Sequence, residues 1–493
     1  MTKDVIMSID QGTTGTTVVL LDHDLNVLAK HNQEFPQHYP QPGWVEHDPE
    51  EIWQCTITTI RKALELAGVS GDRIAGIGIT NQRETTIIWD RCTGQALYKA
   101  IVWQDRRTAP LCDKLKKLGK EALIRRKTGL VLDPYFSGTK IRWILDHVSG
   151  ARQRAKDGSL AFGTIDSFLV YKLTGHKEHV TDVSNASRTL LMNLQGLDWD
   201  QDLLKLLKIP ASLMPLIQPS SKVYGTTKDV PGLPDGIPIA GMAGDQQAAL
   251  FGQACFKAGE AKCTYGTGSF LVMNTGGKLV RSRYKMLTSV GWQLNGKVTY
   301  VLEGSAFIAG AAVQWLRDGL KIISSSPQVE ELAGCVSDSG EVTFVPALVG
   351  LGAPHWKASA RGLISGISRG TTSAHLARAV LEGIALSQYD ILKAMEKDLG
   401  KRVRLLKVDG GASANNLLMQ FQSDILGCQL VRPKMIETTA LGAGFLAGLA
   451  VGFWKDQQEI ANAWREDRVF KPHMMKKERG AILARWNKAV QSA

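Results

Sequence analysis

The sequence predicts an α/β protein with two domains that face each other across a cleft. Three observations favour this fold class. The chain has 493 residues, which is too long for one ordinary hydrophobic core. Segments with strand character alternate with amphipathic helical segments along the chain. A short pattern that combines an aspartate with glycines and threonines also occurs twice, about half a chain apart.

The first copy of this pattern follows a β-prone run at residues 5–9. Asp10 ends the run, and Gln11-Gly12-Thr13-Thr14-Gly15 behind it is typical of a tight turn. Glycine lets backbone N–H groups approach phosphate oxygens, and a carboxylate at the end of a strand can hold a divalent metal through water. Taken alone, the pattern also fits a surface hairpin with an acidic corner, because residues 18–22 predict a second strand.

The second copy lies in the other half of the chain. The β-prone residues 237–244 end in Asp245-Gln246-Gln247, and a hairpin-like pair of segments follows, with the turn Gly266-Thr267-Gly268. Two such half-sites suggest an internal duplication that holds a nucleotide between two domains. The two halves are only weakly similar residue by residue, so the duplication is inferred from the pattern.

Helix and strand signals alternate between and after the two copies. Asp48-Pro49-Glu50-Glu51 is a helix start, with Asp as the cap and Pro at the first helical position. Residues 74–80 and 85–89 predict strands, and residues 230–238, rich in Pro and Gly, predict a boundary loop. Residues 373–399 predict a long helix that ends at Gly400.

A third glycine-rich turn lies near the end of the chain. Residues 403–408 predict a strand, Asp409-Gly410-Gly411-Ala412-Ser413 a turn, and residues 415–426 an amphipathic helix. A Gly-Gly turn at a helix start lets an anion or a purine ring approach closely, although many such turns only connect a strand to a helix. The small residues of 440–448 predict a helix suited to close contact at an interdomain hinge.

Two common nucleotide motifs are not supported. Residues 291–297 have the G-x-x-x-x-G-K spacing of a P-loop, but Val298 replaces the metal-binding Ser or Thr, and the segment predicts a hairpin. No G-x-G-x-x-G follows a strand, which argues against a dinucleotide fold. The sequence therefore predicts phosphate binding by split acidic half-sites.

The charge of the chain limits the classes of ligand that it is expected to bind. The net charge of +12 would help to steer an anionic ligand such as ATP. The basic clusters at 114–127 and 471–488 contain apolar residues at helical spacing and predict solvated helix faces, and no pattern supports nucleic-acid binding.

The cysteines and the apolar segments indicate the cellular compartment of the protein. The seven cysteines are scattered without a C-x-x-C pair, so we expect small core residues in a reducing compartment. No signal peptide is evident, and the longest apolar stretch, 440–454, is too short and too Gly-rich to cross a bilayer. We therefore expect a soluble, cytoplasmic protein without membrane insertion.

Several motifs resemble those of the FGGY carbohydrate kinases, a family of the sugar kinase, actin and heat-shock ATPase superfamily. Phe136-x-x-x-Lys140-Ile141-x-Trp143-Ile144-x-x-His147 resembles the first family signature, and residues 362–367 with 375–382 resemble the second. The resemblance runs from about residue 5 to residue 454. Within the family, the chain is most similar to members that phosphorylate glycerol; the matching segments are 81–86, 102–107, 134–136 and 243–252.

This resemblance implies both a fold and a reaction. The fold would consist of two ribonuclease-H-like (actin-like ATPase) domains, residues 1–252 and 253–493, that face a central cleft. The reaction would be ATP-dependent phosphorylation of glycerol to sn-glycerol 3-phosphate, the first step of glycerol catabolism, with Mg²⁺ assistance. Asp245 would be the general base of an in-line transfer, and the protein would form a homodimer or homotetramer.

The resemblance also implies three groups of site residues. Glycerol would contact Arg83, Glu84, Trp103, Tyr135, Asp245, Gln246 and Phe270. The nucleotide would contact Thr13, Thr14, Gly15, Thr267, Gly310, Gln314, Gly411 and Asn415. The metal would be held by Asp10 and Asp245.

The chemistry of a triol agrees with these assignments. Each hydroxyl can donate and accept, so its site needs a fixed cation and fixed carboxylates. Arg83 and Glu84 would adjoin on a strand and point to opposite faces, so a twist or bulge must aim both inward. Alternatively, this pair is an exposed strand end, Asp245 is a helix cap, and Trp103 is an ordinary core residue.

The chain departs from the family pattern in the first turn. Gly15-Thr16-Thr17 stands where family members often carry Ser-Ser-Arg, so a cation near the phosphates is missing. Hydroxyls and Mg²⁺ must then carry more of the stabilisation, or a lysine elsewhere compensates. Residues 228–236 contain no arginine or glycine-rich run suited to a sugar phosphate, so allosteric control through that loop is not supported.

Two other functions stay open at this point. A family member that acts on a pentulose or an aldonate would need more polar cleft residues and would have little use for Trp103 and Phe270. An ATP-driven switch that binds protein partners would be expected to lack Arg83, Glu84 and Trp103 and to hydrolyse ATP slowly without any polyol.

Overall fold

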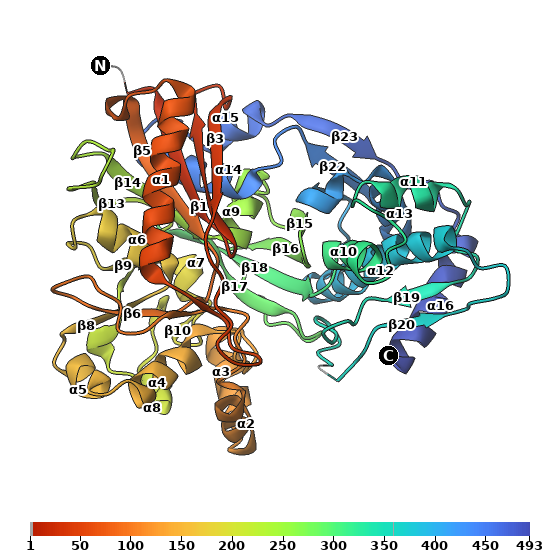
Figure 1. Ribbon diagram of the computed structural model, residues 1–493, viewed down its shortest axis with the longest axis horizontal. Helices are drawn as coiled ribbons and strands as arrows, with labels where there is room; N and C mark the ends of the chain where they lie inside the picture. Colours follow the sequence, from red (N-terminus) through yellow and green to blue (C-terminus); the bar gives the residue numbers. More distant parts are fainter. Residues whose placement is uncertain (1–2, 358) are drawn as a thin grey trace.

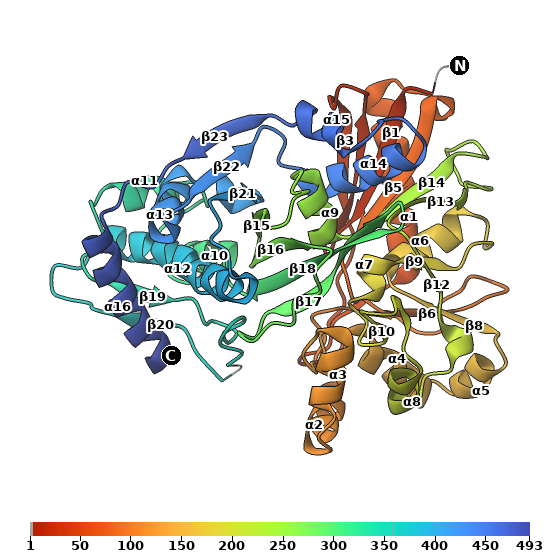
Figure 2. The same ribbon diagram turned by 180° about the vertical axis from the view of Figure 1, so that it is seen from behind.

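Two lobes, each built around a β-sheet, form the molecule (Figure 1). The structure is a computed structural model that describes residues 3–357 and 359–493. Figure 2 shows the same two lobes from behind, with the first sheet beside α1 and the second beside α12. The α/β fold class is confirmed.

The first sheet has six strands in the order β13-β14-β5-β1-β2-β3. They are β1 (Val5–Gln11), β2 (Gly15–Leu21), β3 (Val27–Glu34), β5 (Ile74–Asn81), β13 (Ser221–Thr226) and β14 (Pro238–Gly244). The strands β1, β5 and β14 are parallel, whereas β2 and β3 form an antiparallel meander with β1. Both faces of the sheet are apolar, because helices cover both of them.

The second sheet has seven strands in the order β17-β18-β16-β15-β21-β22-β23. They are β15 (Ala261–Tyr265), β16 (Ser269–Gly276), β17 (Leu287–Leu294), β18 (Lys297–Ala306), β21 (Leu405–Asp409), β22 (Gln429–Pro433) and β23 (Glu466–Phe470). An antiparallel meander is again followed by two parallel neighbours. Both sheets thus combine an antiparallel meander, two parallel neighbours and an antiparallel edge strand, as the internal duplication predicts, and the second sheet has one more strand, β17.

The remaining elements surround these sheets. The longer helices are α1 (Pro49–Ala67), α2 (Ala109–Lys117), α3 (Glu121–Thr128), α4 (Ser137–His147), α6 (Ile165–Leu173), α9 (Asp245–Gly252), α10 (Gly310–Asp318), α12 (Ser373–Leu399), α13 (Asn416–Leu426), α14 (Thr438–Ala450) and α16 (Lys476–Ser492). The short helices are α5 (Ala151–Lys156), α7 (Val183–Ala186), α8 (Gln201–Leu207), α11 (Gln328–Gly334), α15 (Gln457–Ala463), η1 (Gly71–Arg73), η2 (Ala211–Leu213) and η3 (Gly411–Ala414). The short strands are β4 (Glu46–His47), β6 (Ile87–Asp90), β7 (Ala100–Ile101), β8 (Leu160–Gly163), β9 (Val180–Asp182), β10 (Met192–Asn193), β11 (Asp198–Trp199), β12 (Leu216–Gln218), β19 (Thr343–Val345) and β20 (Leu363–Ser365).

The helix α14 packs on the first sheet and on α9, although in the chain it lies between β22 and β23 of the second sheet. A Cβ atom on Gly442 would lie 1.8 Å from the carbonyl oxygen of Ala248, and one on Gly252 would lie 2.0 Å from that of Thr438. The predicted close contact of the small-residue helix is therefore confirmed. It places α9, which begins with Asp245, between the two sheets.

Most of the predicted boundaries agree with the structure. Asp48 caps α1 by accepting a hydrogen bond from the Glu50 N–H, and Gly400 ends α12 in the left-handed conformation. The predicted boundary loop at 230–238 is wrong, because it joins β13 and β14 of one sheet.

The cysteine and membrane predictions have mixed outcomes. Five cysteines are buried as expected, whereas Cys92 and Cys335 are exposed. Within residues 3–357 and 359–493, no helix is long and apolar enough to span a membrane.

Candidate active site

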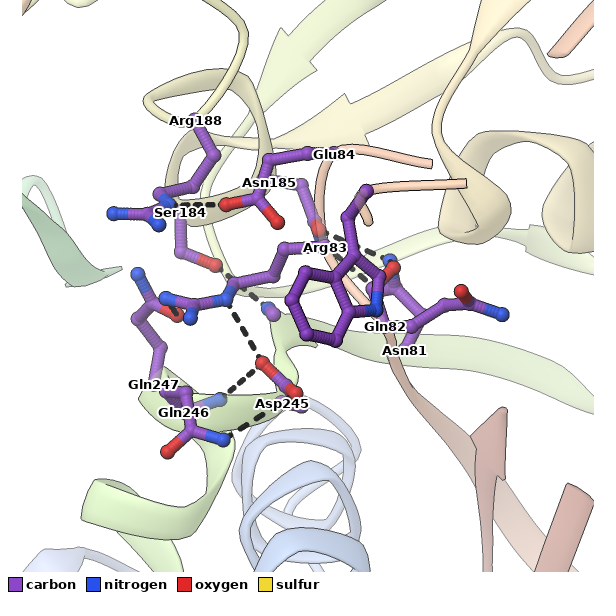
Figure 3. Close-up of polar contacts among 12 residues, drawn as sticks. Asn81, Gln82, Arg83, Glu84, Ser184, Asn185, Arg188, Asp245, Gln246 and Gln247 are labelled. Carbon is purple, nitrogen blue, oxygen red and sulfur yellow. Dashed lines mark hydrogen bonds and ion pairs between the residues drawn. The ribbon is translucent and has the colours of Figure 1, made fainter. Parts of the chain in front are cut away.

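Three parallel strands of the first sheet deliver polar residues to one edge. Asp10 lies at the end of β1, Asp245 directly follows β14, and residues 82–84 directly follow β5. Since the carboxyl ends of parallel strands share an edge, these residues converge there. Figure 3 shows Asp245 together with residues 82–84.

Arg83 and Glu84 lie in a turn beyond the end of β5, so their placement on a strand is wrong. Glu84 has a φ of 60°, a left-handed conformation that is uncommon for a residue with a side chain. This turn replaces the predicted twist or bulge. The two residues are only 3% and 1% exposed, so the alternative of an exposed charge pair is also wrong.

Arg83 is the cation that links the start of α9 to the second sheet. Its Nε lies 2.8 Å from Oδ1 of Asp245, and its Nη1 lies 2.5 Å from Oε2 of Glu303 on β18. Nη1 also donates to Oε1 of Gln247, at 3.2 Å. The guanidinium is therefore held in one orientation before any ligand arrives.

Glu84 has its own arginine partner, Arg188, which follows α7. The Nε of Arg188 donates to Oε1 of Glu84 at 2.5 Å, and its Nη2 lies 3.3 Å from Oε1 of Glu303. Burial opposes the charge of Glu303, but Arg188 and Arg83 outweigh it and lower its pKa to about 2.

Aromatic side chains form the apolar wall of the site. The rings of Trp103 and Tyr135 lie 5.5 Å apart, and the Trp103 indole N–H donates to Oγ1 of Thr13 at 2.9 Å. Trp103 is half-buried and reaches the first Gly/Thr turn, which an ordinary core residue would not do. Phe270 on β16 is paired with Ser305 of β18, so its side chain shares the sheet face of Glu303.

Asp245 is the first residue of α9. Its Oδ1 accepts a hydrogen bond from the Gln246 N–H at 2.7 Å, but the N-cap of α9 is Gly244, so the helix-cap alternative is wrong. The same oxygen meets Arg83, which a capping residue alone does not need. Gln246 is held by Lys262 of β15 through its side-chain oxygen.

Asp10 faces Asp245 from the other half-site. Burial, together with the carboxylates of Asp245 and Glu437, raises the pKa of Asp10 to about 8, and Lys30 opposes this shift. Within the described part of the chain, no three His, Cys, Asp or Glu residues are grouped as metal ligands. A cation between these two carboxylates would thus take further ligands from water or phosphate.

The second lobe contains a cavity of about 460 Å³. Five of the predicted nucleotide residues line it: Thr267, Gly310, Gln314, Gly411 and Asn415. They come from the β15–β16 turn and from the starts of α10 and of η3–α13. The walls are mainly apolar, with Val313, Leu381 and Leu418 among them, as a purine ring requires.

The other predicted nucleotide residues lie apart from this cavity. Thr13 and Thr14 form the turn between β1 and β2, beside Trp103. Gly15 is the first residue of β2, where a Cβ atom would lie 2.7 Å from the Gln33 carbonyl oxygen, so strand packing alone requires glycine there. Thr17, which stands where family members often carry arginine, accepts a hydrogen bond from Asn32.

Comparison with known proteins identifies the family. The model of the N-terminal domain of the FGGY family of carbohydrate kinases matches residues 5–252, and that of its C-terminal domain matches residues 261–451. The chain belongs to the FGGY family of carbohydrate kinases.

Full-length relatives show which members of the family the chain resembles. This FGGY kinase is 59% identical over 490 residues to the glycerol kinase of Myxococcus xanthus, with 99% of each chain covered. It is 59% identical over 486 residues to glycerol kinase 2 of Thermotoga maritima, with 98% of each covered. A crystal structure of Plasmodium falciparum glycerol kinase with ADP matches with a TM-score of 0.93 and 39% identity, covering 100% of this chain and 98% of that one.

Three residues of the FGGY kinase site were missed by the sequence analysis: Arg188, Gln247 and Glu303. Glu303 could have been noticed, because a carboxylate inside the apolar run of β18 indicates a buried charge that needs a partner. Arg188 gives no such signal, because its neighbours resemble those of any polar turn.

Proposed function

We propose that this FGGY kinase transfers the γ-phosphoryl group of ATP to glycerol and forms sn-glycerol 3-phosphate. The observation that carries the proposal is the arrangement of Arg83, Glu84 and Asp245 against the Trp103–Tyr135 wall. A three-carbon triol needs fixed donors and acceptors along one side and an apolar surface along its carbon edge. The close relatives named glycerol kinase support the same substrate.

Asp245 acts as the general base in this proposal. A glycerol hydroxyl is too weak an acid to attack ATP unless it loses its proton as the new bond forms. Arg83 and Glu84 bind the hydroxyls and keep the attacking oxygen beside Asp245, and Gln246, Tyr135 and Phe270 complete the pocket. The rest of the catalysis is positioning and charge stabilisation.

The proposed nucleotide site spans the two lobes. The 460 Å³ cavity would take the base and ribose, with Gly310, Gln314, Gly411 and Asn415 in its wall. Thr13, Thr14 and Thr267 would donate to the phosphates from the two Gly/Thr turns.

Asp10 and Asp245 fit a magnesium ion. Their carboxylates face each other and raise the pKa of Asp10, a repulsion that a divalent cation between them would remove. When bound, the ion would neutralise developing charge on the phosphates. The division at residues 252 and 253, a homodimer or homotetramer, a cytoplasmic location and a place at the start of glycerol catabolism stay predictions.

An ADP-release assay tests the proposal. Glycerol, xylulose, gluconate and no acceptor are each supplied with ATP and magnesium. We expect glycerol to be the preferred acceptor. Faster release with xylulose or gluconate would assign a different carbohydrate, and equal release without an acceptor would assign an ATPase.

A further inference from the structure

Five side chains of alternating charge form a continuous row through the site. In order they are Glu84, Arg188, Glu303, Arg83 and Asp245. The joining distances are 2.5, 3.3, 2.5 and 2.8 Å. The three inner members have side chains that are no more than 2% exposed. Each end of the row is a carboxylate that we propose to contact glycerol.

The row is built from both lobes. Glu84 and Arg83 follow β5 and Arg188 follows α7, whereas Glu303 projects from β18 of the second sheet. In Figure 3 the guanidinium of Arg83 is aimed at Asp245, and that of Arg188 is aimed at Glu84.

The segment that carries Arg188 is itself held in place. Asp182 caps α7 by accepting hydrogen bonds from the Ser184 and Asn185 N–H groups. Asn185 exchanges two amide hydrogen bonds of 3.1 Å with Asn81, the last residue of β5. The segments that carry Arg188 and Glu84 are thereby linked by these side-chain hydrogen bonds as well as by their ion pair.

Such a row is costly to bury, so a role beyond stability is expected. Arg188 is fully buried, and among the described residues its Nη1 and Nη2 make no well-aligned hydrogen bond, although Nη2 keeps its ion-pair contact with Glu303. Its rigid placement comes from the ion pairs with Glu84 and Glu303, and from the Tyr135 and Phe136 rings at 5.4 and 5.2 Å.

We propose that Arg188 and Glu303 are positioning residues for the glycerol site. Arg188 holds the Glu84 carboxylate in its charged, hydroxyl-accepting form, and Glu303 fixes Arg83 between itself and Asp245. This inference rests on the proposed function, because it assigns the residues that orient the groups touching glycerol.

The charges around Glu84 support this role. Burial raises the pKa of Glu84, and Arg188 is the largest opposing influence, followed by Arg83. Glu303 raises the pKa of Glu84. Tyr135 and Lys140 also face Glu84. Without Arg188, the pKa of Glu84 would rise further, and a protonated Glu84 would lose acceptor capacity for a hydroxyl.

The test is Arg188→Met, assayed with glycerol and ATP across pH. We expect the KM for glycerol to rise at least ~10-fold at neutral pH and the KM for ATP to stay within about twofold. We also expect kcat/KM for glycerol to recover as the pH is raised above neutral, because Glu84 then loses its proton. Arg188→Lys keeps a charge beside Glu84, so it should show the raised KM without the new ionisation.

Arg91→Met is the matched control. In the hydrogen bonds found among the described residues, the side chain of Arg91 donates to the carbonyl oxygens of Leu160 and Ser212, and it lies outside the site. It should leave both KM values and the pH profile unchanged.

If Arg188→Met does not fold, Glu303→Gln tests the inference instead. This substitution keeps the shape of the side chain, and each arginine still has one carboxylate partner. It too should raise the KM for glycerol selectively. An unchanged KM for glycerol, or an equal rise in both KM values with an unaltered pH profile, would overturn the inference. A wild-type protein that does not phosphorylate glycerol would instead overturn the proposed function itself.

Discussion

The two oxygens of Asp245 have different surroundings. Oδ1 accepts from the Gln246 N–H and pairs with Arg83 Nε. In the described part of the chain, Oδ2 meets only the Gln246 side-chain amide, at 3.3 Å. One oxygen therefore fixes the carboxylate, and the other is available to take a proton from the substrate.

Asp245→Asn should damage the chemical step more than binding. The amide oxygen can still accept from Gln246 and Arg83, but the side chain can no longer take a proton. We expect kcat to fall by at least about 10², and glycerol affinity by calorimetry to change much less. Asp202→Asn, at an exposed side chain paired with Lys127, is the control. Near wild-type kcat in the Asp245→Asn variant would show that Asp245 only positions the substrate or the metal.

Buried His47 makes stability depend on pH. Its Nε2 lies 2.7 Å from Oε1 of Gln37, and its Nδ1 contacts Gln82, beside Arg83. Burial, with a smaller influence of His38, lowers the pKa of His47 to about 3. The unfolded chain binds this proton near pH 6.5, so below that pH the unfolded state holds more protons than the folded state.

The unfolding free energy should therefore fall as the pH drops from about 6.5 towards 3, and the contribution of His47 should be complete above 6.5. His47→Gln should flatten this dependence, measured as the unfolding temperature between about pH 7.5 and 5. His473→Gln, at an exposed histidine, should keep the wild-type slope. Parallel slopes for wild type and His47→Gln would contradict the prediction.

At the scale of elements, the α9–α14 crossing fixes where Asp245 sits. The backbones approach so closely at Gly442 and Gly252 that no side chain fits between them. A shift of α14 would move α9, and with it the first residue of that helix, out of line with Arg83.

Gly442→Ala should therefore destabilise the protein and reduce its activity. Its Cβ would lie 1.8 Å from the Ala248 carbonyl oxygen, so the helices must separate. We expect a loss of about 1–3 kcal/mol of unfolding free energy, measured by denaturant unfolding. Gly480→Ala on α16 is the control, because its Cβ would meet nothing within 4 Å. Alanine favours helix there, so stability should hold or rise, and equal behaviour of the two variants would contradict the prediction.

The elements that sequence predicted well are those with local signals. Asp48 and Gly400 mark helix ends through caps that depend on a few neighbours, and the Gly/Thr turns follow β-prone runs. The left-handed turn at Glu84 was not predictable, because tertiary packing rather than propensity imposes it. Arg188 and Glu303 were missed for a related reason: they are 115 positions apart (303 minus 188), and only folding pairs them.

At the scale of the whole molecule, the proposed polyol site and the proposed nucleotide cavity are held differently. Glu303 already ties the second sheet to Arg83 and Arg188 without a ligand. The cavity is lined by residues of α10 and α13, and these helices lie farther into the second lobe (Figure 1). Movement of that lobe would bring the nucleotide phosphates towards Asp10 and the first turn.

Small-angle scattering should detect this closure. We expect a smaller radius of gyration with glycerol plus a non-hydrolysable ATP analogue than with either ligand alone, because only both together bridge the lobes. Glycerol alone is the matched control. A radius that does not change with both ligands would contradict a clamping cleft.

The return of α14 to the first sheet also has a consequence for biosynthesis. The strand β14 completes that sheet at Gly244, but the helix that covers its Ile6, Val19 and Leu21 face ends only at Ala450. At a synthesis rate of ~5–20 residues per second, the ribosome needs roughly 10–40 s to make the intervening chain. During that interval the nascent first lobe exposes an apolar surface that is prone to aggregation. A chaperone that shields this surface until α14 emerges would raise the yield of folded enzyme, and a messenger that slows translation after β14 would lower it.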